Sequence, residues 1–214
     1  MLRTYAFALF CPNTNILTIL DMTLEELNSQ ILKCERCALC KTRTNVVPGE
    51  GSSEAEIMLV GEGPGQKEDE LGRPFVGAAG KLLDKLIASI GLQRKDVYIA
   101  NVVKCRPPEN RDPLPEEVDA CRSWLDKQVG IIKPKLIVLL GRHSMDRFLP
   151  NQKISVDHGK PKRYNNQVYY PVYHPAAALY RNGLLEDLKK DFERIPKVLD
   201  IIKEDKAESD KKRS

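Results

Sequence analysis

The alternation of apolar and polar positions predicts a chain in which short strands and helices follow one another. Four apolar runs have strand length and are rich in β-branched or aromatic residues, at residues 56–62, 97–103, 135–141 and 168–174. Helical spacing of apolar residues lies between and after them, at residues 78–90, 114–131, 144–149 and 183–198. Strands that alternate with helices predict an α/β fold with a mostly parallel sheet covered on both faces.

The two ends of the chain differ from this pattern. Thr23 and Glu26 form a capping box that predicts a helix over residues 24–33. Residues 1–21 hold only a short apolar run without a signal-peptide cleavage site, so we expect a poorly ordered extension. Residues 22–200 are expected to form a single domain, and the mixed charges of residues 201–214 predict a charged mobile tail.

The composition limits the class of protein without deciding its function. The chain has 214 residues, 42% of them hydrophobic, which is enough for one large domain with a substantial core. The net charge of +4 permits a nucleic-acid partner without requiring one. No segment has the 18 or more apolar residues of a membrane helix, so we expect a cytoplasmic protein, associated with the nucleoid in a prokaryote.

Unusual residues follow the predicted strands, where open parallel sheets bind their ligands. Three glycines and Glu62 lie in the turn GEGPGQ, and glycine allows the backbone to approach a ligand closely. Gln66 stands where a dinucleotide-binding turn would have its last glycine, and the P-loop lysine is absent. The segment from this turn to the helix at residue 78 is predicted to be one long loop, and such loops are often functional.

Three further side chains are candidates for chemistry at the same edge. Phe75 lies in a polar loop, where it could fill the core or stack on a planar base. Asn101 could read the edge of a base with its amide, or it could cap its own loop. His174 is better placed for chemistry than His143 and His158, although a lone histidine is more often structural.

The six cysteines suggest a metal centre more than disulfides, because no secretory signal is recognised. Cys34 and Cys37 form a CxxC pair, and Cys105 and Cys121 are a plausible second pair. Four thiolates suit zinc or an iron–sulfur cluster. Cys40 offers an alternative third ligand, and the second pair could instead be buried core residues.

The motifs GEGPGxxED, GRPFVGxxGxLL, NVVKCRPPxNRxP and HPAA follow the CxxC pair in this order. Together they resemble the uracil-DNA glycosylase superfamily, and most closely its family 4, whose members are thermostable and carry a [4Fe-4S] cluster. The resemblance extends over residues 22–192. It implies a three-layer α/β/α sandwich around a four-stranded, mostly parallel sheet. It also implies that uracil is flipped out of DNA and its N-glycosidic bond is hydrolysed, which leaves an abasic site for base-excision repair.

The resemblance assigns roles to particular residues. Phe75 matches the residue that stacks on uracil, and Asn101 matches the residue that reads its polar edge. His174 matches the catalytic histidine, which stabilises the departing base anion. Glu62 is the nearest match to a group that steers water or stabilises the positive sugar. The other matched positions in the pocket are Gly63, whose amide lines it, and Glu68, whose role is undefined.

The same resemblance identifies the cluster ligands and the surface that meets DNA. Four cysteines match the ligands of a structural [4Fe-4S] cluster: Cys34, Cys37, Cys105 and Cys121. Leu179, with Tyr180 as second choice, matches the wedge that fills the gap left by the flipped base. Candidate phosphate contacts are Arg73, Lys81, Lys104 and Arg181, although each is more often a solvated surface charge.

The partners implied are uracil-containing DNA, single- or double-stranded, and free uracil as the product. We expect a monomer with no membrane partner, and no peptide for a sliding clamp is recognisable. Three rivals remain. Family 5 lacks a polar side chain at the position of Glu62, and a non-catalytic nucleic-acid-binding module would not need that residue, Asn101 and His174 together. A zinc-stabilised nucleotide-binding protein would lack the brown colour of an iron–sulfur cluster.

Overall fold

A computed structural model of the protein describes residues 22–211, so the extension predicted for residues 1–21 falls outside the described part. The strands form one sheet of six in the order β1-β3-β2-β4-β6-β5. Their bounds are β1 (Glu50–Gly51), β2 (Ile57–Gly61), β3 (Tyr98–Asn101), β4 (Leu136–Leu140), β5 (Lys162–Tyr164) and β6 (Gln167–Val172).

The four predicted strands are confirmed as β2, β3, β4 and β6, which pair in parallel at the centre of the sheet. The predicted total of four strands is wrong, because β1 and β5 add short antiparallel strands at the two edges. Neither edge strand is long enough to show an alternating pattern. The hairpin between β5 and β6 does have a signal, since Asn165 and Asn166 both adopt positive φ, as a two-residue hairpin turn requires.

The helices predicted near residues 24–33, 78–90, 114–131 and 144–149 are also confirmed. They are α1 (Leu24–Leu32), α3 (Ala78–Ser89), α4 (Pro115–Ile132) and α5 (Arg142–Phe148). The capping box is present. Thr23 Oγ1 accepts the Glu26 N–H at 3.2 Å, and a carboxylate oxygen of Glu26 accepts the Thr23 N–H at 2.9 Å. Two short helices, α6 (Ile154–Asp157) and α7 (Pro175–Leu179), complete the middle of the chain.

The long loop predicted before α3 is interrupted by a helix that the sequence analysis missed. Helix α2 (Gln66–Leu71) starts directly after the glycine-rich turn and ends at Gly72, whose φ of +67° closes it in the left-handed region. Six residues are too few to show helical periodicity. The acidic residues Glu68 and Asp69 lie in its first turn, where they interact favourably with the helix dipole.

The closing helix predicted at residues 183–198 is in fact two helices, α8 (Asn182–Glu193) and α9 (Ile195–Lys211). Pro196 explains the break, because it has no N–H to continue the hydrogen-bond ladder of α8. The tail predicted to begin at residue 201 is corrected, since α9 remains helical through Lys211. Lys203 pairs with Glu56 at 2.8 Å, which holds this helix to the end of the sheet.

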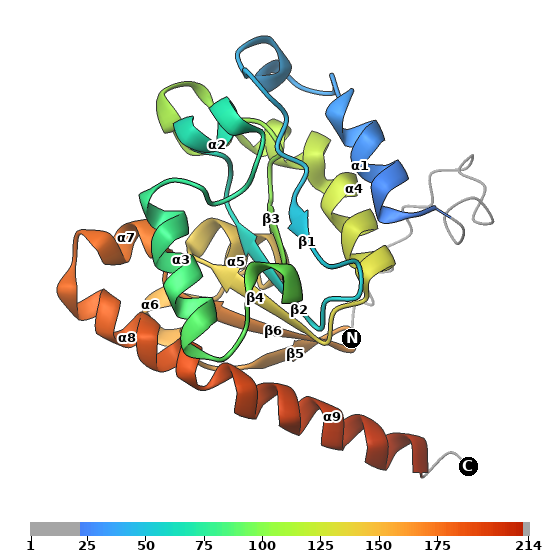
Figure 1. The fold of residues 1–214 in the computed structure, drawn as a ribbon, viewed down its shortest axis with the longest axis vertical. Coiled ribbons are helices and arrows are strands. Elements are labelled where there is room, and N and C mark those ends of the chain that lie inside the picture. Colours follow the sequence, from blue (N-terminus) through green and yellow to red (C-terminus); the bar gives the residue numbers. More distant parts are fainter. Residues whose placement is uncertain (1–21, 212–214) are drawn as a thin grey trace, which may run out of the picture.

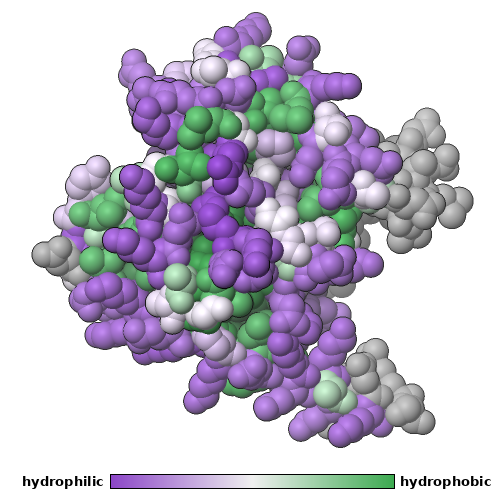
Figure 2. Space-filling view, in the orientation of Figure 1, coloured by the Kyte–Doolittle hydropathy of each residue, from purple (hydrophilic) through white to green (hydrophobic). Residues whose placement is uncertain are grey.

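Two apolar clusters cover the faces of the sheet and give the predicted three-layer α/β/α arrangement. Met58 and Val60 of β2 belong to the cluster with α1 and α4, whereas Ile57 and Leu59 belong to the cluster with α3 and α8. Figure 1 shows α4 and α3 on opposite sides of the sheet, with α9 extending past the body of the molecule. On the face shown in Figure 2, polar residues cover most of the surface and apolar residues form only small patches. No described helix is both long and apolar enough to cross a membrane.

Candidate active site

A cavity of about 300 Å³ opens at the carboxyl ends of β2, β3 and β6. Its wall includes all six residues that the sequence analysis placed in the base pocket: Glu62, Gly63, Glu68, Phe75, Asn101 and His174. The parallel sheet explains this convergence, because segments far apart in the sequence end at the same edge. The structure thus brings the predicted pocket residues together.

Asn101 ends β3 beside Gly61 of β2 and is only 1% exposed. Its Oδ1 atom is buried without a hydrogen-bond partner, and such an oxygen costs about 1–3 kcal/mol. Both side chains pack directly against Gly61, because a Cβ there would lie 2.5 Å from Oδ1 and 2.6 Å from Cζ of Phe75. Asn101 therefore lies in the cavity wall with an acceptor that no described group satisfies.

Phe75 forms another wall of the cavity. The residue is 6% exposed, and its ring centroid lies 5.7 Å from that of His174, with the two rings tilted by 32°. Glu68 supports the next two residues, because its Oε1 accepts the N–H groups of Val76 at 2.8 Å and Gly77 at 2.9 Å. The carboxylate whose role the sequence left undefined therefore anchors the Phe75 segment to α2.

His174 is fixed in one tautomer by its own helix. It caps α7, and its Nδ1 accepts the N–H of Ala176 at 3.1 Å. Burial is the main cause that lowers the pKa of His174 to about 4; nearby His143 lowers it further and Glu68 opposes the shift. The ring is therefore neutral at pH 7 and carries its proton on Nε2.

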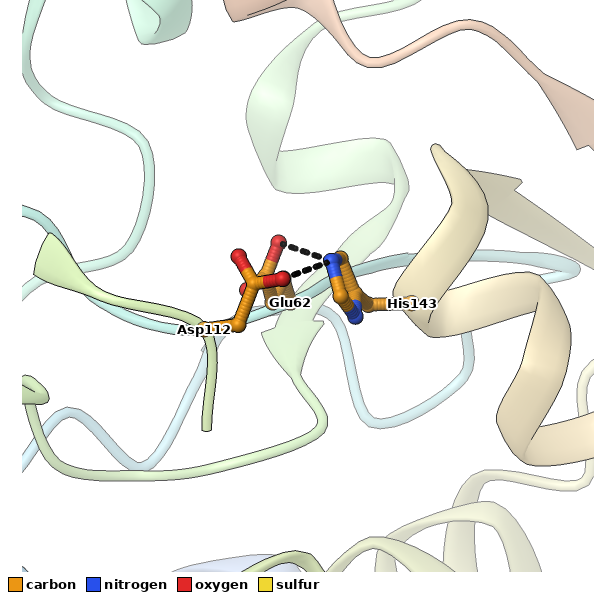
Figure 3. A group of neighbouring side chains, drawn as sticks. All are labelled: Glu62, Asp112 and His143. Atoms are coloured by element: carbon orange, nitrogen blue, oxygen red, sulfur yellow. Dashed lines mark ion pairs between the residues drawn. The ribbon is translucent and has the colours of Figure 1, made fainter. Parts of the chain in front are cut away.

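Glu62 lies in a group of side chains that the sequence analysis did not identify. Figure 3 shows His143 Nε2 between Glu62, at 3.7 Å, and Asp112, at 3.2 Å. Burial is the main cause that raises the pKa of Glu62; His143 and Arg142 lower it and Asp112 raises it. Asp112 and His143 could have been found, since each follows a predicted strand at the edge that carries the site.

The spacing of Glu62, Asp112 and His143 is compatible with a metal ion, because their ligand atoms lie within 4.8 Å of one another. A guanidinium already supplies positive charge there. Arg142 Nη2 lies 3.3 Å from the Asp112 carboxylate and 2.9 Å from His143 Nε2. The group is therefore better described as an ion-pair network beside the cavity.

Comparison with known proteins gives the family. The model of the uracil DNA glycosylase superfamily matches residues 48–199. The chain is 49% identical over 183 residues to a type-4 uracil-DNA glycosylase of Sulfurisphaera tokodaii, which covers 81% of this chain and 83% of the relative. Type-4 uracil-DNA glycosylases of Archaeoglobus fulgidus and Saccharolobus solfataricus are 48% and 46% identical, over 81% and 82% of this chain and 92% and 86% of theirs. This chain belongs to the type-4 uracil-DNA glycosylase family.

The four cysteines assigned as ligands in this type-4 glycosylase come together away from the base cavity. Cys34, Cys37, Cys105 and Cys121 line one small cavity, whose lining does not include Cys40. Four thiols around one cavity are a donor set that suits zinc or an iron–sulfur cluster.

Hydrogen-bond donors surround these sulfurs, as in iron–sulfur sites. Trp124 Nε1 donates to Cys34 at 3.2 Å, Arg43 to Cys105 at 3.2 Å and the Lys104 backbone to Cys121 at 3.3 Å. The residues therefore fit an anionic cluster bound by four thiolates.

One of the predicted phosphate contacts, Lys104, is wrong because its side chain is buried. Lys104 is 1% exposed, and its Nζ donates to the Asn101 carbonyl at 2.9 Å and to Gln128 at 2.7 Å. Burial lowers the pKa of Lys104 to about 8, and the adjacent thiols of Cys121 and Cys105 oppose that shift. Arg73 is exposed but forms two hydrogen bonds to Glu50, at 2.7 and 2.8 Å.

The predicted wedge residues of this type-4 glycosylase lie on the surface, close in sequence to His174. Leu179 ends α7, the helix that His174 caps, and Tyr180 follows it. Leu179 is 43% exposed and Tyr180 is 88% exposed. Both are therefore accessible to a large partner from solvent.

Proposed function

We propose that this type-4 glycosylase removes uracil from DNA in the cavity bounded by Phe75, Asn101 and His174. The carrying observation is the buried Asn101 Oδ1 without a partner at the wall of that cavity. A uracil ring offers a donor at N3 that would satisfy it. The base is reached by flipping, and the product in DNA is an abasic site.

Selectivity against cytosine follows from the same atom. Uracil N3 carries a hydrogen that Asn101 Oδ1 accepts, whereas cytosine N3 is an acceptor and would leave the oxygen unsatisfied. A buried mismatch of this kind costs about 1–3 kcal/mol, and sites built around hydrogen bonds reject such analogues strongly. Phe75 supplies the face on which the flipped base stacks.

His174 acts as a neutral donor to the departing base. Because its Nδ1 accepts a backbone N–H, its Nε2–H is available to uracil O2. As the C1′–N1 bond breaks, its electron pair leaves with uracil and negative charge develops on O2, where a preorganised donor stabilises it. A ring that is already neutral at pH 7 needs no proton loss before it can act.

Glu62 supplies the negative charge on the other side of the reaction. Its carboxylate lines the cavity beside the Gly63 backbone. We assign it to the sugar, where it orients the water that adds to C1′ or stabilises the positive charge that builds there. His143 lies beside it, with Nε2 3.7 Å from its carboxylate, and Asp112 contacts the same nitrogen at 3.2 Å.

The family implies a [4Fe-4S] cluster, which Cys34, Cys37, Cys105 and Cys121 would hold. Its contribution would be structural, because Cys34 and Cys37 follow α1 whereas Cys105 follows β3 and Cys121 lies on α4. A shared centre would therefore fix the Asn101–Cys105 loop to two helices. Leu179 and Tyr180 would enter the DNA next to the flipped base, as an apolar wedge.

The test is uracil release from an oligonucleotide with one U opposite G, followed by alkaline cleavage at the abasic site. T:G and hypoxanthine substrates are run beside it. Cleavage of the U strand alone is the expected result, and cleavage of the hypoxanthine strand would favour a broader family-5-like activity. Brown, folded protein that cleaves none of the substrates would contradict the proposed function.

A pair of glycine variants tests whether this cavity is the site. Gly61→Ala places a Cβ against Asn101 and Phe75, so both side chains must shift and uracil release should fall at least about 100-fold. Gly130→Ala is the matched control, because a Cβ there meets nothing within 4 Å on α4. Equal activity of the Gly61→Ala and Gly130→Ala variants would show that this cavity is not the site of uracil release.

A further inference from the structure

The backbone of Phe75 adopts a conformation that a phenylalanine rarely takes. Its φ is +51°, in the left-handed region that is unfavourable for residues other than glycine. Strained backbone of this kind persists only where the surrounding structure over-determines it, and it concentrates at functional sites. The contacts of this segment show what holds it.

Arg94 holds the segment from its carbonyl side. It lies in a 3₁₀ turn before β3, and it donates from Nη2 to the Pro74 carbonyl at 2.6 Å and from Nη1 to the Phe75 carbonyl at 3.1 Å. Its guanidinium is aimed by two carboxylates, Asp84 at 2.9 Å and Glu50 at 3.4 Å. Nearly all the N–H groups of the Arg94 guanidinium therefore form hydrogen bonds near Phe75.

The same segment is also held at the N–H groups that follow Phe75 and by helix α3. Glu68 accepts the N–H groups of Val76 and Gly77, as described above. Helix α3 approaches so closely at Gly80 that a Cβ there would lie 1.9 Å from the Phe75 carbonyl oxygen. We call Arg94, Glu68 and Gly80 the Phe75 clamp.

We propose that Arg94 is a positioning residue for base recognition, which acts by keeping Phe75 in its stacking geometry before DNA binds. Arg94 is absent from the cavity wall, so it acts through Phe75 and not on the base. A platform ordered in advance avoids an ordering cost at the moment of binding. The inference rests on the proposed role of Phe75 as the surface on which uracil stacks.

The simpler alternative is that Arg94 only stabilises the fold through its ion pairs. The two roles differ in what they change. If Arg94 only stabilises the fold, its removal lowers the melting temperature but leaves the affinity of the folded enzyme for uracil unchanged. If Arg94 positions Phe75, its removal weakens uracil binding even when the enzyme is fully folded at the assay temperature.

The variants separate these roles. Arg94→Met removes every donor but keeps the apolar stem, and Arg94→Lys returns one charged donor. Arg73→Met is the matched control, because it removes a two-bond pair to the same Glu50 but leaves the carbonyl contacts of Arg94 intact. Phe75→Leu is made alone and together with Arg94→Met.

The readouts are the inhibition constant of free uracil, KM and kcat for base release, and hydrogen exchange of the amides of Val76 and Gly77. Arg94→Met should weaken uracil inhibition about tenfold, comparable to the loss of base stacking in Phe75→Leu. It should also speed exchange at both amides. Arg94→Lys should recover part of the loss, and Arg73→Met should match the wild type in inhibition by free uracil within about twofold.

The double variant decides the mechanism. If Arg94 acts through Phe75, adding Arg94→Met to Phe75→Leu changes uracil inhibition by less than about twofold, because coupled sites are not additive. Two losses that multiply, or a lower melting temperature with unchanged uracil inhibition, would overturn the positioning role. No loss in Phe75→Leu itself would instead refute the stacking role on which the inference rests.

Discussion

At the scale of single residues, Asn101 and His174 present complementary hydrogen-bonding groups to one cavity. Asn101 Oδ1 is an acceptor without a partner, and His174 Nε2 carries a hydrogen because its Nδ1 accepts the N–H of Ala176. Uracil has an N3 donor next to an O2 acceptor, which suits this pair. Both residues were predicted from their places after strands and both line the cavity, but the sequence could not fix the histidine tautomer.

His174→Ala tests the donor at O2. Loss of a preorganised donor to a developing anion should lower the single-turnover rate of base release about 100- to 1,000-fold. Affinity for uracil-containing DNA, measured by fluorescence anisotropy, should change by less than about threefold, because phosphate contacts dominate it. Equal losses in rate and in binding would show that His174 positions DNA instead.

Glu62 sets the expected pH dependence. Burial raises the pKa of its carboxyl above the ordinary value of 4.5, so base release should fall as the pH drops through that raised value. Glu62→Gln should be at least about 100-fold slower. Its remaining rate should be level from pH 8 to pH 5 and should fall only toward pH 4, where His174 becomes protonated. An unchanged acidic limb in the variant would show that another group controls it.

At the scale of elements, the segment between β2 and α3 is a short helix followed by a clamped turn. Helix α2 presents Glu68 to the amides of Val76 and Gly77, and Gly77 is the N-cap of α3. The glycine at the N-cap has no side chain to cap the helix, but its own N–H is bound by Glu68 from a different element. Its carboxylate therefore connects the order of α3 to the position of Phe75.

Glu68→Ala tests this connection. Loss of the two hydrogen bonds should lower the free energy of unfolding by about 1–2 kcal/mol, as loss of a helix cap does, and should weaken uracil inhibition. Urea unfolding and inhibition by free uracil measure the two effects. Glu70→Ala, on the same helix and paired only with Gln66 and the exposed Lys67, is the control and should leave both unchanged. A loss of stability without weaker uracil inhibition would show that Glu68 stabilises the fold but does not position Phe75 for uracil binding.

At the scale of the whole molecule, two centres lie on either side of one loop. Asn101 reaches the base cavity, and four residues later Cys105 reaches the cysteine cavity. Lys104 lies between them and connects the Asn101 carbonyl to Gln128 on α4. An anionic cluster would stabilise this buried ammonium, so cluster binding and the order of the base pocket are expected to be coupled.

The cysteine variants test this arrangement. Cys121→Ser should lose the brown chromophore and the bound iron, and should lower the melting temperature by several degrees or more, because structural metal centres contribute directly to folding. Cys40→Ser should keep both, since Cys40 does not line the shared cavity. Iron analysis and absorbance measure the result. Loss of iron from Cys40→Ser but not from Cys121→Ser would place Cys40 in the cluster.

The sequence by itself determined the central strands, most of the helices and the edge of the sheet that carries the site. These follow from local periodicity and from the rule that parallel strands end at one edge, which pointed to Asn101 and His174, whereas the role of Phe75 was predicted from the family resemblance. It missed β1 and β5 because they have only two and three residues, and α2 because Leu71 is its single apolar residue.

Only the tertiary structure decided how the chosen residues are held. The strained φ of Phe75, the position of Arg94 behind it and the burial of Lys104 each depend on contacts between segments far apart in the chain. The same holds for His143 and Asp112, whose importance comes from their distance to Glu62. Local sequence specifies elements, whereas charges, tautomers and strain are set by what the packed elements place beside one another.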